Sequence, residues 1–246
     1  MKLKNRILYE ISELKKELSI WEYLSWWALR IAMLVTYVVF TINGEALYQR
    51  NLILLNTLAT FAIPLLRFVS PRALFTSRIT FRTGTYIDIF VLLGSFLGHG
   101  LKFLGEIHEY DKFMHVVAGG VVVFIGVEVI KSFDGYEKLT PGIKTFCGIG
   151  FSYIIIVLWE IMEFFADWFI TTSNNQGYYI VPDETTFFVK IFGMSPNMPD
   201  NAPVYDTNAD MFYAVIGCGI CAAILYIWLK KKEKKALSQK EEVKVN

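Results

Sequence analysis

The stretch "YDTNADMFYAVIGCGICAAILYIWLKKKEKK", residues 205–235, decides the fold class. It passes from a polar loop into about 20 apolar residues and ends in a lysine run, a pattern typical of a membrane-spanning helix. Asp206 and Asp210 lie one helical turn apart where the apolar part begins. Similar apolar runs recur along the 246 residues, of which 54% are hydrophobic and 16% aromatic. The composition therefore predicts an all-α, polytopic membrane bundle.

Six spans are predicted, at approximately 24–42, 51–67, 86–104, 113–130, 148–170 and 210–229. Each is close to the ~20 residues that cross a bilayer core of ~30 Å. Pro64 is expected to kink the second span near its end. The chain then divides into an N-terminal amphipathic helix at the membrane surface (1–20), a membrane domain (21–230) and a basic tail (231–246).

Lysine and arginine indicate the orientation. They gather in the N-terminal segment, in "RFVSPRALFTSRITFR" (67–82), near 131–144 and in the tail "KKKEKKALSQK" (230–240), which six spans place on one side. The opposite loops contain few basic residues, so both termini are predicted to be cytoplasmic. The connection 171–209 would then lie outside the cytoplasm, and its aromatic segments "YYIV" and "TTFFVKIF" favour an ordered lid of short strands or a re-entrant flap.

Ionisable side chains inside the predicted spans need a physical reason, because each costs about 2.5–3.5 kcal/mol at a helix centre on insertion scales. Arg30, Asp88 and Glu128 lie toward the cytoplasmic side in three different spans. Their similar depth suggests mutual compensation that fixes helix packing. Alternatively, Arg30 could extend its charge to the interface.

A larger group of ionisable side chains lies toward the outer side. Its members are His99 in the third span, Asp111 and His115 in the fourth, Glu160, Glu163 and Asp167 in the fifth, and Asp206 and Asp210 at the start of the sixth. Helical spacing puts Asp111 and His115 on one face, and the three acids of the fifth span on another. At a rise of 1.5 Å per residue, the group falls within roughly 15 Å of the outer surface, so we expect a shared polar pocket. Gly119 is expected to leave room beside the imidazole.

This residue set leaves three functions open. In an enzyme, His115, Glu160, Glu163 and Asp210 would act in acid–base or metal-assisted chemistry on a lipid, a lipid-linked envelope precursor or a lipoprotein. A divalent metal ion is a candidate cofactor, with ligands drawn from His99, Asp111, His115, Glu160, Glu163, Asp206 and Asp210. Alternatively, the cluster only holds the helices of an assembly protein together around a membrane protein partner, or it relays protons in an ion-coupled carrier.

Several other classes of protein are excluded because their motifs are absent from the sequence. The sequence contains no Gly-rich phosphate loop, dinucleotide fingerprint, G-x-S-x-G or H-E-x-x-H. Beside a membrane, the lysine-rich tail indicates contact with anionic lipids rather than nucleic acid. Cys218 and Cys221 form a C-x-x-C on an apolar helix, where two small packing residues are the simpler interpretation.

Three segments resemble the YjdF-like family of bacterial membrane proteins, which is similar to the broader VanZ-like group. They are "YDKFMH" (110–115), "WEIMEFFAD" (159–167) and "YDTNADMFYAVIG" (205–217), and the resemblance extends over roughly residues 30–230. It implies a compact bundle in the bacterial cytoplasmic membrane, with Asp111, His115, Glu160, Glu163, Asp206 and Asp210 as its site residues. VanZ-like proteins are associated with low-level resistance to glycopeptide antibiotics of the teicoplanin kind. The asparagine of the VanZ pattern, one turn after the last aspartate, is Ala214 here.

Overall fold

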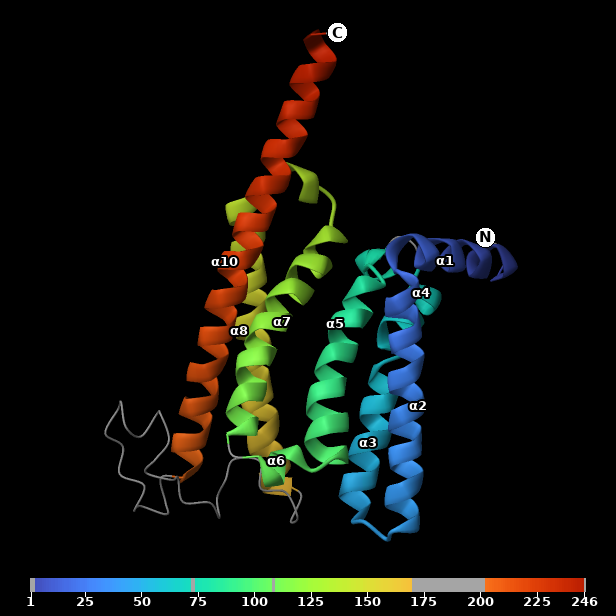
Figure 1. Ribbon diagram of the computed structural model, residues 1–246, viewed down its shortest axis with the longest axis vertical. Coiled ribbons are helices and arrows are strands. Elements are labelled where there is room, and N and C mark those ends of the chain that lie inside the picture. The colour runs from blue at the N-terminus through green and yellow to red at the C-terminus, as the bar shows by residue number, and fades with distance from the viewer. Residues whose placement is uncertain (1–2, 72–73, 108, 170–201, 246) are drawn as a thin grey trace.

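The protein is a bundle of helices that run back and forth between two ends (Figure 1). The computed structural model describes residues 3–71, 74–107, 109–169 and 202–245. Within these ranges the chain forms helices and no strand, which confirms the all-α prediction for this part of the protein. The segments predicted to form a lid, "YYIV" and "TTFFVKIF", lie outside the described residues.

The helices follow one another in a simple order. They are α1 (Leu3–Glu17), α2 (Ile20–Ile42), α3 (Leu47–Ala59), α4 (Ala62–Val69), η1 (Phe75–Arg78), α5 (Arg82–Val91), η2 (Leu92–Gly100), α6 (Phe103–Glu106), α7 (Tyr110–Lys131), η3 (Tyr136–Lys138), α8 (Pro141–Phe169) and α10 (Ala202–Val245). We call the end that carries α1 and the C-terminus the terminal end. The opposite end, with α6 and the first turns of α7 and α10, is the distal end (Figure 1).

Four helices are long and apolar enough to cross a membrane: α2, α7, α8 and the part of α10 from Asp206 to Gln239. A fifth candidate is the pair α3 and α4, which is bent by 48°. The remaining predicted span corresponds to α5, of 10 residues, and η2, a π-helix of 9 residues that continues it. These two run beside α3 and α7 toward the distal end (Figure 1). Each of them alone is too short to cross a membrane. The predicted total of six is therefore supported only as four or five.

The bend between α3 and α4 has a clear cause in the sequence. Pro64 has no amide hydrogen, so the carbonyl of Thr60, four residues earlier, has no helical partner. The guanidinium of Arg30 on α2 donates to that carbonyl at 2.6 Å. Arg30 also lies 3.4 Å from Asp88 on α5. The predicted kink and the predicted compensation of Arg30 by Asp88 are both confirmed.

Glu128, the third member of the predicted inner group, has different partners. Its carboxylate accepts a hydrogen bond from Thr80 at 2.7 Å and another from Lys131, one turn later on α7. It therefore ties the α4–α5 connection to α7 and does not join Arg30. Similar depth along the bundle did not identify the partners of Glu128, because α7, which carries Glu128, and α2, which carries Arg30, lie on different sides of α5.

Helix α1 is attached to the terminal end by Arg67 of α4. Arg67 is buried and pairs with Glu10 at 2.9 Å and Glu17 at 2.8 Å, both on α1. Beyond this attachment, α1 extends sideways from the bundle (Figure 1) and exposes Ile7 and Ile11. An exposed apolar stripe on a charged helix agrees with the predicted position at a membrane surface.

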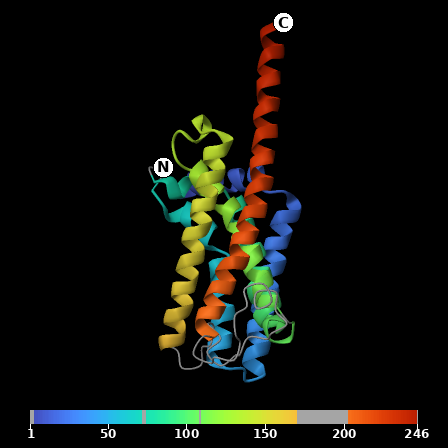
Figure 2. The same ribbon diagram turned by 90° about the vertical axis from the view of Figure 1, so that its left-hand side faces the viewer.

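Helices α7, α8 and α10 form a closely packed group (Figures 1 and 2). A Cβ atom on Gly119 of α7 would overlap the carbonyl of Ala214 on α10, and one on Gly217 would overlap the carbonyl of Val116. Ser152 of α8 donates to the carbonyl of Gly119 at 2.9 Å. Gly119 therefore permits a close crossing of α7 with α10, whereas room beside the imidazole of His115 stays a prediction.

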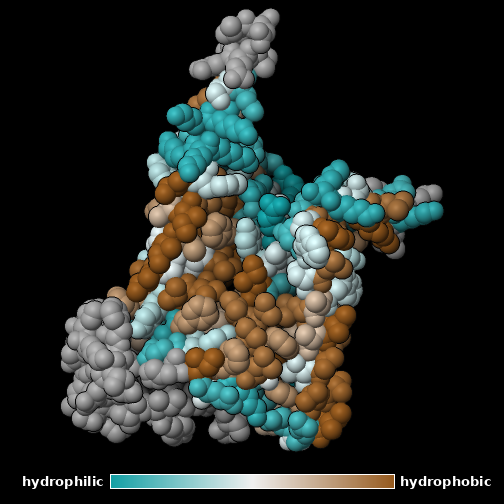
Figure 3. All heavy atoms as spheres, viewed as in Figure 1, coloured by the Kyte–Doolittle hydropathy of each residue, from teal (hydrophilic) through white to brown (hydrophobic). Residues whose placement is uncertain are grey.

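The surface of the bundle matches a membrane environment. In Figure 3 an apolar band covers the middle of the visible face, and hydrophilic residues gather toward both ends. The structure differs from the sequence prediction at the start of α10, which begins at Ala202. Asp206 therefore lies inside the helix, whereas the predicted loop extended to residue 209; Asp210 is helical as predicted.

Candidate functional site

The polar site lies at the distal end of α7, α8 and α10. α7 contributes Asp111 and His115 from its first two turns, α8 contributes Glu160 and Glu163, and α10 contributes Asp206 and Asp210. The close crossing of α7 with α10 brings the turns that carry Asp111 and His115 next to the turns that carry Asp206 and Asp210. Of these six side chains, Asp111 is the most exposed and Asp210, at 1%, the most buried.

Lys112 connects three of these carboxylates. Its ammonium lies 2.6 Å from Asp210, 2.7 Å from Asp206 and 3.1 Å from Asp111. Lys112 is not among the site residues predicted from the sequence, although it stands inside the motif "YDKFMH". The available signal was its place in the first turn of α7, where a positive charge opposes the helix dipole and needs nearby carboxylates.

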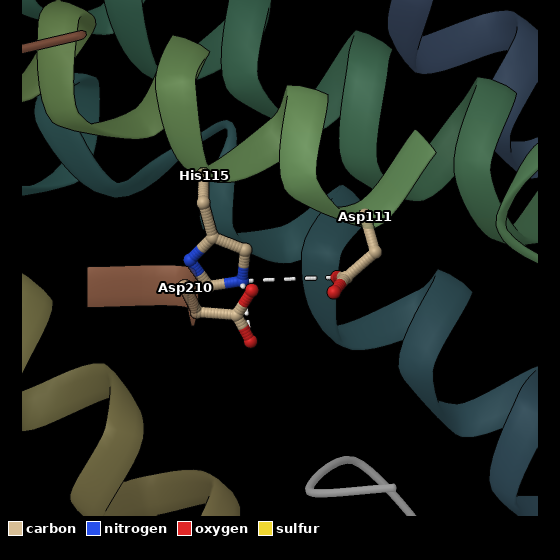
Figure 4. A group of neighbouring side chains, drawn as sticks. All are labelled: Asp111, His115 and Asp210. Atoms are coloured by element: carbon tan, nitrogen blue, oxygen red, sulfur yellow. Dashed lines mark ion pairs between the residues drawn. The ribbon is translucent and has the colours of Figure 1, made fainter. Parts of the chain in front are cut away.

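His115 lies between carboxylates on both sides of its ring. Its Nε2 atom is 3.6 Å from Asp210 and 3.7 Å from Asp111, and its Nδ1 atom is 4.0 Å from Glu160. Figure 4 shows that Asp111 and Asp210 approach the same ring nitrogen. These separations are longer than hydrogen bonds, so the imidazole is surrounded by acceptors without being bonded to them.

Glu160 is the least satisfied group of the site. The residue is 6% exposed, and among the described residues neither carboxylate oxygen accepts a well-formed hydrogen bond, although Thr207 of α10 faces it. Glu163 accepts a hydrogen bond from the indole of Trp159 at 2.6 Å through one oxygen, and its other oxygen has no partner in the part of the chain that the structure describes. Burying an unpaired carboxylate is costly, so both groups require a counter-charge, a proton or a ligand.

The charges of the site do not balance within the described residues. Asp111, Glu160, Glu163, Asp206 and Asp210 are five carboxylates, and Lys112 is the one ammonium among them. Two overlapping groups have oxygen and nitrogen atoms within 4.8 Å of one another, namely Asp111, His115 and Asp210, and Glu160, Glu163 and Asp210. This arrangement is suited to a cation.

Two predicted members stand apart from this cluster. His99 lies on η2, and no hydrogen bond or ion pair joins it to the site among the residues that the structure describes. Asp167 lies one turn beyond Glu163 near the end of α8, and its charge acts on Asp206. The prediction that His99 shares the pocket is not supported by a contact, because η2 packs beside α3 and α2 more than against α7.

The fold and this buried polar cluster define a helical integral membrane protein. The model of a protein family described as "Predicted membrane protein (DUF2238)" matches residues 24–231. The chain belongs to this family of membrane proteins. The matched range runs from α2 to α10 and so includes every residue of the site. No curated protein and no solved structure matched the chain.

Proposed function

We propose that the protein lies in the bacterial cytoplasmic membrane with both termini in the cytoplasm, and that its distal cluster binds and acts on the polar part of a lipid or a lipid-linked envelope precursor. The single observation that carries this is Glu160. Among the described residues this buried carboxylate has no well-formed hydrogen bond, which makes its burial costly, and its Oε1 atom lies 4.0 Å from Nδ1 of His115. Such groups mark functional sites more often than packing defects.

The distribution of charge supports the orientation. Lys131, Lys138, Lys144 and the lysines that begin at Lys230 all lie toward the terminal end, where α1 also lies. The positive-inside rule then places the terminal end in the cytoplasm and the distal cluster at the outer side. It also favours six crossings, with α3–α4 and α5–η2 as two of them.

Aromatic side chains indicate the depth of the site. Trp168 and Phe169 at the end of α8 are strongly exposed, as expected for residues in the interface between membrane and water. Glu163 lies five residues before Trp168, which is about 7 Å along a helix. The cluster therefore lies just below the level of the lipid headgroups, where a phosphate or ester of a lipid could reach it.

The resemblance of three motifs to the YjdF-like family supports a place in the bacterial cytoplasmic membrane. Without a metal ion, His115 beside Glu160 would act as an acid–base pair that takes a proton from water or a hydroxyl group.

A structural role is the second candidate, and Lys112 favours it. One ammonium that binds Asp111 on its own helix and two aspartates of α10 holds these helices together without any substrate. In that case the site would be a clamp. The two functions differ at Glu160, which the clamp does not use.

The test compares the wild-type protein with Glu160→Gln and His115→Ala, with Glu128→Gln as the control for a buried carboxylate on α7 outside the cluster. Each purified protein is incubated with a bacterial polar-lipid extract. Bound lipids are identified by native mass spectrometry, and their conversion is followed by liquid chromatography. We expect wild type and Glu128→Gln to retain or convert the same lipid species. In the two site variants, the amount of lipid retained or converted should fall at least tenfold. Equal behaviour of all four folded proteins would overturn the proposal.

A further inference from the structure

We propose that the cluster holds one divalent transition-metal ion between Nε2 of His115, Oδ1 of Asp111 and Oδ2 of Asp210. The inference rests on the proposed function, because it assigns a cofactor to the same site. It also narrows seven candidate ligands from the sequence to three, and it gives Glu160 a separate role in positioning the imidazole.

The first argument is the distance between the donor atoms. Nε2 of His115 lies 3.7 Å from Oδ1 of Asp111 and 3.6 Å from Oδ2 of Asp210, and the three atoms lie within 4.8 Å of one another. In a tetrahedral site with bonds of about 2.0–2.2 Å, ligand atoms are about 3.3–3.6 Å apart. Small side-chain movements would complete the site, and Figure 4 shows both carboxylates already turned toward this nitrogen.

The second argument uses a carboxylate outside the proposed ligand set and concerns the other face of the imidazole. A metal-bound histidine usually donates its second ring N–H to a carboxylate, which fixes the ring and its tautomer. Oε1 of Glu160 lies 4.0 Å from Nδ1 of His115, and among the described residues neither oxygen of this buried carboxylate accepts a well-formed hydrogen bond. Glu160 is therefore placed to orient the ring once Nε2 is occupied.

The contacts of Lys112 support the same choice of ligand atoms. Its ammonium uses Oδ2 of Asp111 and Oδ1 of Asp210, which leaves the opposite oxygen of each aspartate facing His115. The lysine thus holds both carboxylates in place by the atoms that a metal would not use.

The composition of the ligand set indicates the class of ion. One imidazole and two carboxylates suit Zn²⁺ or Mn²⁺ better than Ca²⁺ or Mg²⁺, which prefer oxygen alone. The second group, Glu160, Glu163 and Asp210, lacks a nitrogen donor, and Trp159 already uses one oxygen of Glu163. A divalent ion would also offset part of the excess negative charge.

The experiment uses full-length protein in detergent after treatment with a chelator. Zn²⁺ alone is titrated by calorimetry, Mn²⁺ alone by electron paramagnetic resonance, and the bound ion is counted by mass spectrometry of the metal. We expect one ion per chain and at least a 100-fold loss of affinity in His115→Ala and Asp210→Asn. Glu160→Gln should weaken binding about 10–100-fold, as is typical when the partner of a metal-bound histidine is changed.

Two control variants lie outside the cluster. His99→Ala removes the imidazole of η2, and Glu128→Gln neutralises a buried carboxylate of α7, so both should bind the ion as wild type does. X-ray absorption of the zinc-loaded protein should show a single imidazole with oxygen ligands. Absence of binding by folded wild-type protein, an equal loss in His99→Ala, or sulfur ligands would overturn the assignment.

The metal and lipid measurements separate the two proposals. If lipid is retained or converted in a Glu160-dependent way but no ion binds, the metal site is wrong and the proposed function stands. If an ion binds as described but no lipid does, the metal site stands and the proposed function is wrong.

Discussion

At the scale of single residues, the distal cluster depends on Lys112. Its ammonium is mostly buried and contacts aspartates on two helices, so it is the main positive charge that keeps α7 and α10 together near the membrane surface. Buried ion pairs add little net stability over apolar packing, but removing one partner leaves the other charge uncompensated. Replacing Lys112 alone should therefore lower the stability of the protein strongly, because it leaves the aspartates without their counter-charge.

We expect Lys112→Met to lower the free energy of unfolding by about 3–5 kcal/mol in the presence of a chelator. The thermal midpoint in detergent measures this. Lys102→Met is the control, because Lys102 is exposed and its pair with Glu45, at 3.4 Å, should contribute at most about 1 kcal/mol. Equal midpoints for the two variants would show that Lys112 is not the counter-charge of the cluster.

The sequence predicts the proximity of the cluster better than its internal bonding. Helical spacing and depth bring Asp111, His115, Glu160 and Asp210 to one level, and the structure places them together. Depth alone could not reveal which oxygen of each aspartate faces Lys112, since that depends on side-chain rotamers and on the angle between α7 and α10. The functional roles of these residues stay predictions.

At the scale of elements, the site depends on how closely α7 and α10 cross. Gly119 and Gly217 remove the side chains that would otherwise separate the two backbones. The crossing lies one to two turns from His115 and Asp210. Any increase in the separation of α7 and α10 would therefore also increase the distance between these two side chains. Small residues of this kind are common where membrane helices pack.

Gly217→Ala is expected to push the helices apart, because its Cβ would overlap the backbone carbonyl of Val116. A backbone atom cannot rotate away as a side chain can, so the thermal midpoint should fall and metal and lipid binding should weaken together. Gly219→Ala is the matched control on α10, since nothing lies within 4 Å of its added Cβ. An unchanged midpoint in Gly217→Ala would contradict this account of the crossing.

Two features of these elements could not be predicted from the sequence. Pro64 predicts a kink, but the use of the released Thr60 carbonyl by Arg30 depends on the packing of α2 against α3, whose C-terminal cap is Thr60. The change from α-helix to π-helix at Leu92 has no clear local signal either, because the apolar pattern continues through both segments. Because of this change, the span predicted at 86–104 is divided into two short helices.

At the scale of the whole molecule, the main prediction is the side of the membrane on which each end lies. The chain reverses between the terminal and distal ends after each long helix (Figure 1). Most of the lysine and arginine residues belong to segments at the terminal end. We expect the terminal end to face the cytoplasm.

This orientation can be measured by cysteine labelling. After Cys147, Cys218 and Cys221 are replaced by alanine, one cysteine is introduced by Lys102→Cys at the distal end or by Glu137→Cys at the terminal end, where both residues are exposed. A membrane-impermeant maleimide should label Lys102→Cys in intact spheroplasts and Glu137→Cys only after lysis. The reverse result would invert the orientation and place the cluster on the cytoplasmic side.

The uninterrupted length of α10 links the two sides of the protein mechanically. The helix has 44 residues, and it extends about 40 Å from its crossing with α7 at Gly217 to its last turn. A tilt of about 5° at this pivot would displace the far tip by about 4 Å. Rearrangement around Asp210 would therefore be carried as a lever motion to the lysine-rich extension, where another molecule could sense it.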